Sequence, residues 1–311
     1  TSVTGVQTCA LPISLIIISV IVCVFATMPV QAALKIFACT PEWSALAKEL
    51  GGDKVDVYSA TNALQDPHHV EARPSLIARA RSADLVICTG AQLEIGWLPL
   101  VLTQAGNPKI QTGQPGNFEA SRYVTMLEVP SSVDRSQGDV HPGGNPHIHL
   151  DPRNIAKIAA ALVERMAQLD GAEAQTYRTR AKTFLEKWQQ AIQRWETEAA
   201  PLKGMITVGY HKNMTYLDNW LGIRENGYLE PKPGLPPTTA HMSELLAQLK
   251  SEPAKAVVRS AYNDPRAAEW LSSNAKIPVV VLPFTVGGTD KAKDLFSLFD
   301  DTVARLLAVA R

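Results

Sequence analysis

An apolar pattern runs from Ala174 to Ala199 without an interrupting Gly or Pro. Few folds can accommodate an uninterrupted segment of this length. Its apolar residues recur mostly in alternating steps of three and four, the spacing of one face of an α-helix. At 1.5 Å per residue such a helix would be about 39 Å long, roughly the width of a domain. A flexible linker would instead be rich in Gly, Ser or Pro, so the pattern predicts a rigid helix that joins two lobes.

Short strand patterns alternate with helix patterns on both sides of this helix, as in βαβ units on a parallel sheet. The expected strands are residues 34–39, 55–60, 83–88, 205–209, 256–259 and 279–282. The other expected helices are residues 42–50, 74–81, 154–169, 215–221, 243–250, 265–273 and 291–310. The predicted fold class is therefore α/β, with two lobes that are each a parallel sheet flanked by helices, joined by a single long backbone helix.

The amino-terminal region predicts export. The apolar stretch from Leu15 to Ala26 is too short to span a bilayer, and the small-residue pattern Val30-Gln31-Ala32 that follows is typical of a signal-peptidase site. Residues 1–14 contain no Met, Lys or Arg. They resemble the translation of a sequencing adapter, and we leave them out of the fold prediction. The expected mature chain begins at Ala33 in the periplasm.

The expected organisation follows from these patterns and is listed from the amino terminus. It comprises a signal peptide with an atypical start (1–32), an N-terminal α/β lobe that binds metal (33–171), a linking backbone helix (172–202) and a C-terminal α/β lobe (203–311). The chain has 311 residues, of which 46% are hydrophobic, enough for a sizeable core in about two domains. Its 30 basic and 30 acidic residues balance, so no electrostatic footprint for nucleic acid is present.

Two cysteines remain after the expected cleavage, Cys39 and Cys88, each at the end of a predicted strand. An oxidising periplasm allows them to form a disulfide. Two buried free thiols are an equally good interpretation of the same pattern.

Three histidine motifs follow strand-like runs at widely separated places. They are Asp66-Pro67-His68-His69, Asn145-Pro146-His147-Ile148-His149 and Val208-Gly209-Tyr210-His211. Ligand sites of α/β folds form where strands end, and neutral imidazoles that converge there can hold a transition metal. Three imidazoles with at most one carboxylate favour Zn²⁺ over Mn²⁺, because manganese sites need more oxygen donors.

Further motifs accompany these histidines in a recognisable order. They are Glu71 and Pro74-Ser75 after His68, Gly90 with Leu93-Glu94 and Trp97-Leu98, Leu150-Asp151-Pro152 after His147, and Tyr216-Leu217 with Leu221-Gly222 after His211. With them, essentially the whole mature chain resembles the substrate-binding proteins of zinc and manganese ABC transporters, the cluster A family. The resemblance implies two α/β lobes on one rigid helix and metal ligands at His68, His147 and His211.

The fourth ligand departs from the family pattern, which usually supplies an Asp just after the last strand of the second lobe. Val286 stands at about that position, and Asp290 follows across Gly287-Gly288. We predict Asp290 as a metal ligand, with capping of the final helix as an equal alternative. A water molecule or Asp264 could also complete the site.

The remaining histidines have weaker assignments. His69 would point away from His68 in an extended chain, and His241 near a helix start is expected to be structural. His149 would share a strand face with His147, but the resemblance places an aromatic there, which favours packing or hydrogen bonding. His141 lies in the loop 130–146, together with Asp134 and Asp139. That loop is far shorter than the His- and acid-rich loops of some zinc-binding members of the family, so we expect a plain surface segment more than an arm that gathers zinc.

The expected function is that of a periplasmic high-affinity zinc receptor, a monomer that delivers Zn²⁺ to an ABC permease in the inner membrane and is not an enzyme. The alternative is a zinc-dependent hydrolase, because three histidines and a water also form catalytic sites. The sequence has no His-Glu-x-x-His and no recognisable general base for that role. A receptor for haem, a cobalamin or a siderophore on the same two-lobe plan would need a wide apolar cleft, and the three histidines argue against that alternative.

Overall fold

The computed structural model describes residues 1–5, 32–132, 136 and 138–310. Most of the predicted signal peptide lies outside these residues. Thr1–Ala32 and Ala33–Arg311 are separate units, and the fold described here is that of the second. No helix in the described part of the chain is long and apolar enough to cross a membrane.

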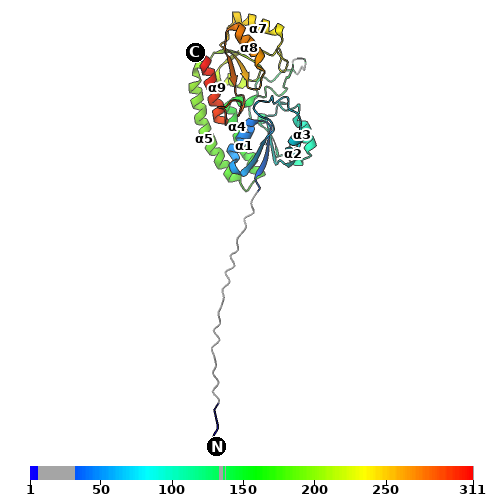
Figure 1. Ribbon diagram of the computed structural model, residues 1–311, viewed down its shortest axis with the longest axis vertical. Coiled ribbons are helices and arrows are strands. Elements are labelled where there is room, and N and C mark those ends of the chain that lie inside the picture. The colour runs from blue at the N-terminus through cyan, green and yellow to red at the C-terminus, as the bar shows by residue number, and fades with distance from the viewer. Residues whose placement is uncertain (6–31, 133–135, 137, 311) are drawn as a thin grey trace. The chain divides into compact units, whose positions relative to one another are not determined.

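Two parallel sheets of four strands each form the centres of the two lobes (Figure 1). The first-lobe strands are β1 (Leu34–Ala38), β2 (Val55–Ser59), β3 (Leu85–Cys88) and β4 (Asn117–Glu119), in the order β2-β1-β3-β4. The second-lobe strands are β5 (Ile206–Gly209), β6 (Arg224–Tyr228), β7 (Ala256–Ser260) and β8 (Val279–Leu282), in the order β6-β5-β7-β8. The two sheets therefore share one topology, and the predicted α/β fold class is confirmed.

Helices flank both sheets. They are α1 (Pro41–Gly51), α2 (Pro74–Ser82), α3 (Leu98–Ala105), α4 (Pro152–Leu169), α5 (Ala174–Glu198), α6 (Thr215–Leu221), α7 (Thr239–Ser251), α8 (Pro265–Ala275) and α9 (Leu295–Ala310). Short 3₁₀ helices lie at Gly52–Lys54, Pro108–Ile110, Ala120–Tyr123, Ile148–Leu150 and Ala200–Leu202. Pro at the first helical position starts α1, α2, α4 and α8, where its missing N–H leaves no hydrogen bond unmade.

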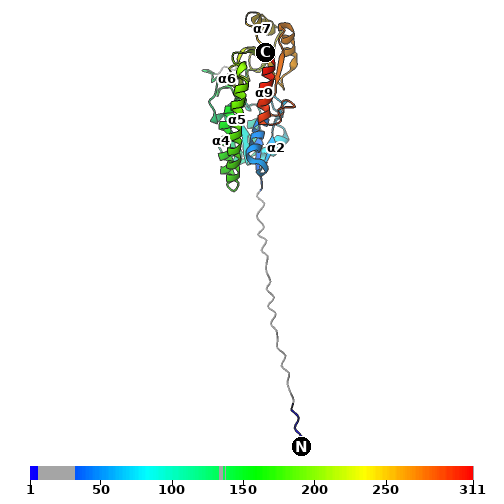
Figure 2. The ribbon, with the colours of Figure 1, turned by 90° about the vertical axis from the view of Figure 1, so that its left-hand side faces the viewer.

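The long helix α5 packs against α1 and α4 of the first lobe and against α9 (Figures 1 and 2). Its buried face carries large aromatic side chains, including Tyr177, Phe184, Trp188 and Trp195. The Trp188 indole N–H also donates to the Pro152 carbonyl oxygen at 2.8 Å, at the start of α4. Each such side chain buries enough apolar surface to stabilise the fold by about 1.5–3 kcal/mol, so this contact fixes α5 rigidly.

The end of the chain differs from the sequence prediction, because α9 begins at Leu295 and not at residue 291. The Asp294 carboxylate accepts from the Ser297 N–H at 2.7 Å, and the Ser297 hydroxyl oxygen accepts from the Asp294 N–H at 2.9 Å. This reciprocal pair is a capping box. Asp294, and not Asp290, therefore caps the final helix, which removes the capping alternative for Asp290.

Cys39 and Cys88 form a disulfide in the first lobe, with Cα atoms 4.9 Å apart. The two residues end up together because β1 and β3 are adjacent parallel strands. The structure therefore agrees with the disulfide interpretation of the two cysteines and not with two free thiols. The disulfide ties together the strand ends that lead into the loops of the first lobe.

Candidate metal centre

Three histidines from distant parts of the chain meet between the lobes. His68 lies in the loop after β2, His147 directly precedes the 3₁₀ helix before α4, and His211 follows β5. A ring nitrogen of each lies within 4.8 Å of a ring nitrogen of the other two. The ring centre of His68 lies 5.4 Å from that of His147 and 5.5 Å from that of His211, and the ring centres of His147 and His211 are 5.4 Å apart.

These separations match a tetrahedral ion. With zinc–nitrogen bonds of about 2.0–2.1 Å and ring centres about 1.2 Å beyond the nitrogen, two imidazoles on one tetrahedral zinc have centres about 5.3 Å apart. Adjacent ligands at right angles on an octahedral ion, with bonds of similar length, would have centres about 4.6 Å apart. The three ring separations are therefore closer to the values expected for a tetrahedral ion than to those for an octahedral one.

Each of the three rings is oriented by an oxygen at its Nδ1 atom. The acceptors are Asp66 Oδ1 for His68 at 2.7 Å, Asn145 Oδ1 for His147 at 2.8 Å and Glu230 Oε2 for His211 at 2.6 Å. An acceptor at Nδ1 places the ring proton there and leaves the lone pair on Nε2. All three Nε2 atoms are thus set up as ligands.

Two of these partners come from one local motif that occurs twice. In Asp66-Pro67-His68, the Asp66 side chain accepts from the backbone N–H of His68 at 3.0 Å as well as from its ring. In Asn145-Pro146-His147, the Asn145 oxygen accepts from the backbone N–H of His147 at 3.1 Å in the same way. A polar residue, Pro and His in succession therefore builds a pre-oriented ligand. This signal is visible in the sequence, although the sequence analysis did not assign a role to Asp66 or Asn145.

Glu230 is the site residue with no signal near its histidine, since it lies 19 residues after His211 in the loop beyond β6. Its carboxylate also accepts from the Gly234 N–H at 2.9 Å, which fixes its position. The parallel pairing of β5 with β6 brings the two segments together. The sequence analysis missed Glu230 because Glu230 and His211 become neighbours only in the folded sheet.

Burial keeps the site ready for a cation. Burial, and then the charge of His68, lower the pKa of His147 well below its usual value, so its ring is neutral at pH 7. Burial alone would raise the pKa of Asp66, but hydrogen bonds from His68 and its ring charge outweigh this and hold that pKa at about 2. His147 therefore offers a neutral ring to a cation, and the carboxylate of Asp66 stays ionised beside His68.

Asn145 links this centre to the contact between the lobes. Its amide nitrogen donates to Glu128 Oε2 at 3.0 Å, to the Lys212 carbonyl at 2.9 Å and to Thr215 Oγ1 at 3.1 Å. The Lys212 ammonium pairs with Glu128 at 2.7 Å. The residue that orients His147 thus also contacts the residue next to His211.

His149 takes no part in the three-histidine group. Its Nε2 lies 2.9 Å from the Phe284 carbonyl oxygen, and its Nδ1 lies 3.7 Å from Glu42 Oε1. Glu42 also accepts from the Thr285 hydroxyl at 2.6 Å. The segment around His149 is a 3₁₀ helix and not the strand that the sequence suggested, so His147 and His149 do not face the same way. His149 holds the loop after β8 against the first lobe.

The structure does not bring the predicted fourth ligand to this group. Among the described residues, the group holds His68, His147 and His211 without Asp290, which is exposed in the turn after Gly287-Gly288. Ligation by Asp290 stays a prediction that requires this turn to move. Asp264 instead caps α8 and pairs with Arg266, whose hydrogen bonds lower the pKa of Asp264 to about 2.

The other two histidines of the sequence analysis lie apart from the group. The His69 side chain is 67% exposed, with Nε2 3.9 Å from Asp139 Oδ2. His241, in the first turn of α7, has its Nε2 2.8 Å from the Tyr228 carbonyl oxygen. Both positions agree with the roles expected from the sequence.

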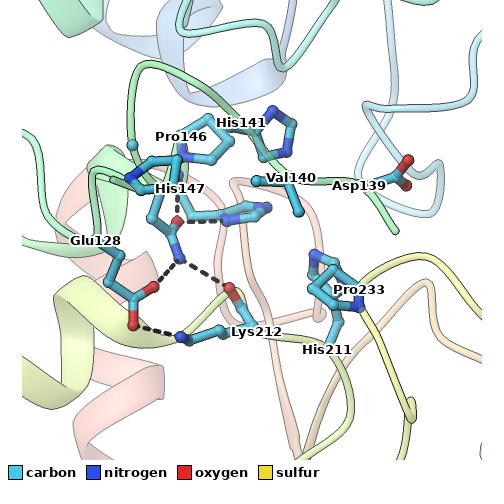
Figure 3. A pocket seen from close by; sticks show the side chains of 12 residues that line it. Glu128, Asp139, Val140, His141, Pro146, His147, His211, Lys212 and Pro233 are labelled. Atoms are coloured by element: carbon cyan, nitrogen blue, oxygen red, sulfur yellow. Dashed lines mark hydrogen bonds and ion pairs between the residues drawn. The ribbon is translucent and has the colours of Figure 1, made fainter. Parts of the chain in front are cut away.

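His141 is nearer to the group than the prediction of a plain surface loop implies. It lines the same pocket as His147 and His211 (Figure 3), and its ring centre lies 5.4 Å from that of His68. Burial, and then the charge of His68, lower the pKa of His141 to about 4. The sequence analysis underrated this residue because a Gly- and Pro-rich loop gives no indication of where it folds back.

Comparison with known proteins identifies this architecture. The family model described as "Zinc-uptake complex component A periplasmic" matches residues 36–309. The manganese ABC transporter substrate-binding lipoprotein PsaA of Streptococcus anginosus is 22% identical over 266 residues, which cover 84% of this chain and 83% of the relative. The iron ABC transporter substrate-binding lipoprotein MtsA of Streptococcus pyogenes is 23% identical over 268 residues, covering 84% of this chain and 82% of the relative.

Solved structures show the same fold. A crystal structure of ZnuA superposes with a TM-score of 0.70 at 20% identity, covering 89% of this chain and 97% of the other. The Mn-bound periplasmic metal binding protein from Candidatus Liberibacter asiaticus superposes with a TM-score of 0.71 at 16% identity, covering 90% and 100%. Together with the family match over nearly the whole folded unit, these similarities place the chain in the zinc-uptake component A family of the cluster A metal ABC transporter substrate-binding proteins, which bind and deliver metal ions and are not enzymes.

Proposed function

We propose that this chain is a periplasmic receptor that binds Zn²⁺ between its lobes and delivers it, as a monomer, to an ABC permease in the inner membrane. His68 and His147 from the first lobe and His211 from the second would each bind through Nε2. The observation that carries this proposal is the set of three ring separations of 5.4–5.5 Å, which match a tetrahedral ion.

The donor set supports zinc over manganese. The nearby carboxylates of Asp66 and Glu230 are already committed to the Nδ1 atoms of His68 and His211, so the atoms that face the ion are nitrogens. Manganese sites in proteins favour carboxylate, carbonyl and water oxygens. Some relatives are named for manganese and iron. The preference for zinc over these metals is therefore the part of the proposal that most needs a test.

The disulfide supports an oxidising compartment. Cys39 and Cys88 are bonded, and disulfides persist in the periplasm but are rare in a reducing cytosol. Cleavage after Ala32, as predicted from the sequence, would deliver the folded unit there.

Release of the ion would require the lobes to separate at the site. The contacts around Asn145 and the bond between Thr285 and Glu42 connect the lobes, and the packed α5 helix restrains them on one side. We expect a small rocking movement with loop reordering, in which the permease breaks these contacts.

A competition titration tests the proposal. Metal-free protein beginning at Ala33 is titrated with Zn²⁺ against a chromophoric chelator, first alone and then with a large excess of Mn²⁺. We expect one Zn²⁺ per chain and almost no displacement by Mn²⁺. Comparable affinities for the two ions, or no stoichiometric zinc binding, would contradict the proposal.

A further inference from the structure

His141 has an unexplained buried nitrogen beside the three-histidine group. Its Nε2 atom is buried and, within the described part of the chain, has no hydrogen-bond partner. The Nε2 atoms of His68 and His147 are in the same condition. A buried polar atom without a partner costs about 1–3 kcal/mol, so three such nitrogens on neighbouring histidine rings point to a partner that they share.

The ring of His141 is adjacent to one ring of the three-histidine group, that of His68. Its ring centre lies 5.4 Å from that of His68, equal to the separations within the three-histidine group. It also lines the pocket between the lobes with His147 and His211 (Figure 3). His69 and His241 do not line this pocket; the His69 side chain is exposed, and the His241 Nε2 faces a carbonyl oxygen.

We propose that His141 supplies the fourth ligand and that the complete site is a tetrahedral shell of four imidazoles. This inference rests on the proposed zinc-receptor function and extends it. The nitrogen of His141 is not within the close group of the other three, so its loop must move inward by a short distance when the ion binds.

The loop that carries His141 can make this movement. Gly143 and Gly144 follow His141. A Cβ atom at Gly143 would make only ordinary van der Waals contact, with the nearest atom at 3.5 Å, whereas Gly144 packs closely against Leu127, so movement is expected before Gly144. The loop is held at both ends, by the Asp139 N–H to the Pro233 carbonyl at 2.9 Å and by the Asn145 N–H to the Leu127 carbonyl at 2.8 Å. Pro233 belongs to the second lobe, so ligation by His141 would fasten this loop across the cleft.

A shell of four neutral nitrogens has a consequence for selectivity. It offers no carboxylate to a hard cation, so it should reject Mn²⁺ more strongly than a site with three histidines and one Asp. The His141→Asp variant should therefore bind Mn²⁺ more tightly relative to Zn²⁺ than the natural chain does.

Three single variants and the wild type test the assignment. They are His141→Ala, Asp290→Ala as the rival ligand, and His69→Ala as the matched control on the same face. Zinc affinity is measured by chelator competition, and the visible spectrum of the Co²⁺-loaded protein reports the coordination number. We expect His141→Ala to weaken zinc binding by about tenfold or more and to reduce the intense bands of tetrahedral Co²⁺, with both other variants near wild type.

Each other outcome has a definite meaning. If His141→Ala binds zinc like the wild type and keeps the Co²⁺ spectrum, the inference is overturned, whether Asp290→Ala then weakens binding or a water completes the site. If wild-type protein binds no zinc at all, the proposed function fails, and this inference with it. A thermal melt of each metal-free variant identifies any loss caused by misfolding, in which case His141→Asn replaces His141→Ala.

Discussion

Each histidine of the three-histidine group has a partner that accepts a hydrogen bond from Nδ1, and two of these partners are carboxylates. Asp66 and Glu230 present carboxylate oxygens, whereas Asn145 presents an amide oxygen. A carboxylate makes the ring a stronger donor to a metal, since it stabilises positive charge on the imidazole. The residue-scale chemistry of the site therefore depends on these three oxygens as well as on the rings.

Alanine replacement of any one of His68, His147 and His211 should lower zinc affinity by about a hundredfold or more, because each removes one of the bonds to the ion. His241→Ala is the control, since that ring bonds to a carbonyl oxygen away from the site. Chelator competition measures the effect. A loss in the control as large as in the three variants would show that the assay reports folding and not ligation.

Glu230→Gln should lower zinc affinity by about 10–100-fold, because the amide oxygen no longer stabilises positive charge on the metal-bound ring of His211. Metal-free stability should change little, because Gln can still accept from His211. Glu244→Gln on the exposed face of α7 is the matched control. An unchanged affinity in Glu230→Gln would mean that His211 needs no orientation by a carboxylate.

At this scale, much of the site was readable in the sequence. His68 and His147 stand in polar-Pro-His motifs, whose local hydrogen bonds need no other part of the chain. Glu230 and His141 could not be assigned, because their nearness to the histidines depends on strand pairing and on the path of a long loop. Local motifs predict local geometry, and the sequence holds no comparable signal for contacts across the fold.

The elements show the same division. The central strands β1, β3, β5 and β7 and the more apolar edge strands β2 and β8 were predicted from the sequence, whereas β4 and β6 were missed. Both missed strands lie at sheet edges and have polar sequences, Asn-Phe-Glu and Arg-Glu-Asn-Gly-Tyr. Edge strands often carry polar residues against aggregation, so their periodicity is weak. The late start of α9 could have been read from its capping box at Asp294 and Ser297.

Two acidic side chains of the second lobe, one on α6 and one on β6, are buried close to each other. Asp218 on α6 and Glu225 on β6 each have a buried carboxyl oxygen. Burial and mutual repulsion raise the pKa of Asp218, and burial raises that of Glu225. The folded chain thus retains protons that the unfolded chain releases at about pH 4. The free energy of unfolding should fall as pH rises above that value.

Glu225→Gln should reduce this fall, because one of the two acids can no longer ionise. Melting temperatures of metal-free protein at about pH 4.5 and about pH 8 measure it, and the difference should shrink by a few degrees, since about 1 kcal/mol corresponds to about 2–4 °C. Glu244→Gln should leave the difference unchanged. If the melting temperature falls as much between these two pH values in Glu225→Gln as in the wild type, the acid pair is not the cause of the fall.

At the scale of the whole molecule, the two lobes of like topology are held by α5 on one side and by polar contacts at the site on the other. The aromatic face of α5 makes the first connection permanent. The second consists of hydrogen bonds such as Thr285 to Glu42, which can break and re-form. This asymmetry suits a receptor that must release its ion without unfolding.

The disulfide should stabilise the first lobe within this arrangement. Reduction, or the double variant Cys39→Ser/Cys88→Ser, should lower the free energy of unfolding by about 2–4 kcal/mol, because the bond limits the unfolded chain. Denaturant titrations with and without reductant measure the effect, and the double variant should not respond to reductant. Two free thiols in unreduced, denatured protein beginning at Ala33 would contradict the assignment.

The central claim is that histidine nitrogens from both lobes bind one Zn²⁺, and X-ray absorption at the zinc edge tests it most directly. Protein loaded with one equivalent of Zn²⁺ should show a four-coordinate shell at about 2.0 Å, with the outer-shell scattering of at least three imidazoles. His211→Ala should lose one imidazole from that pattern. A six-coordinate shell dominated by oxygen, or the same spectrum in His211→Ala as in the wild type, would contradict the account.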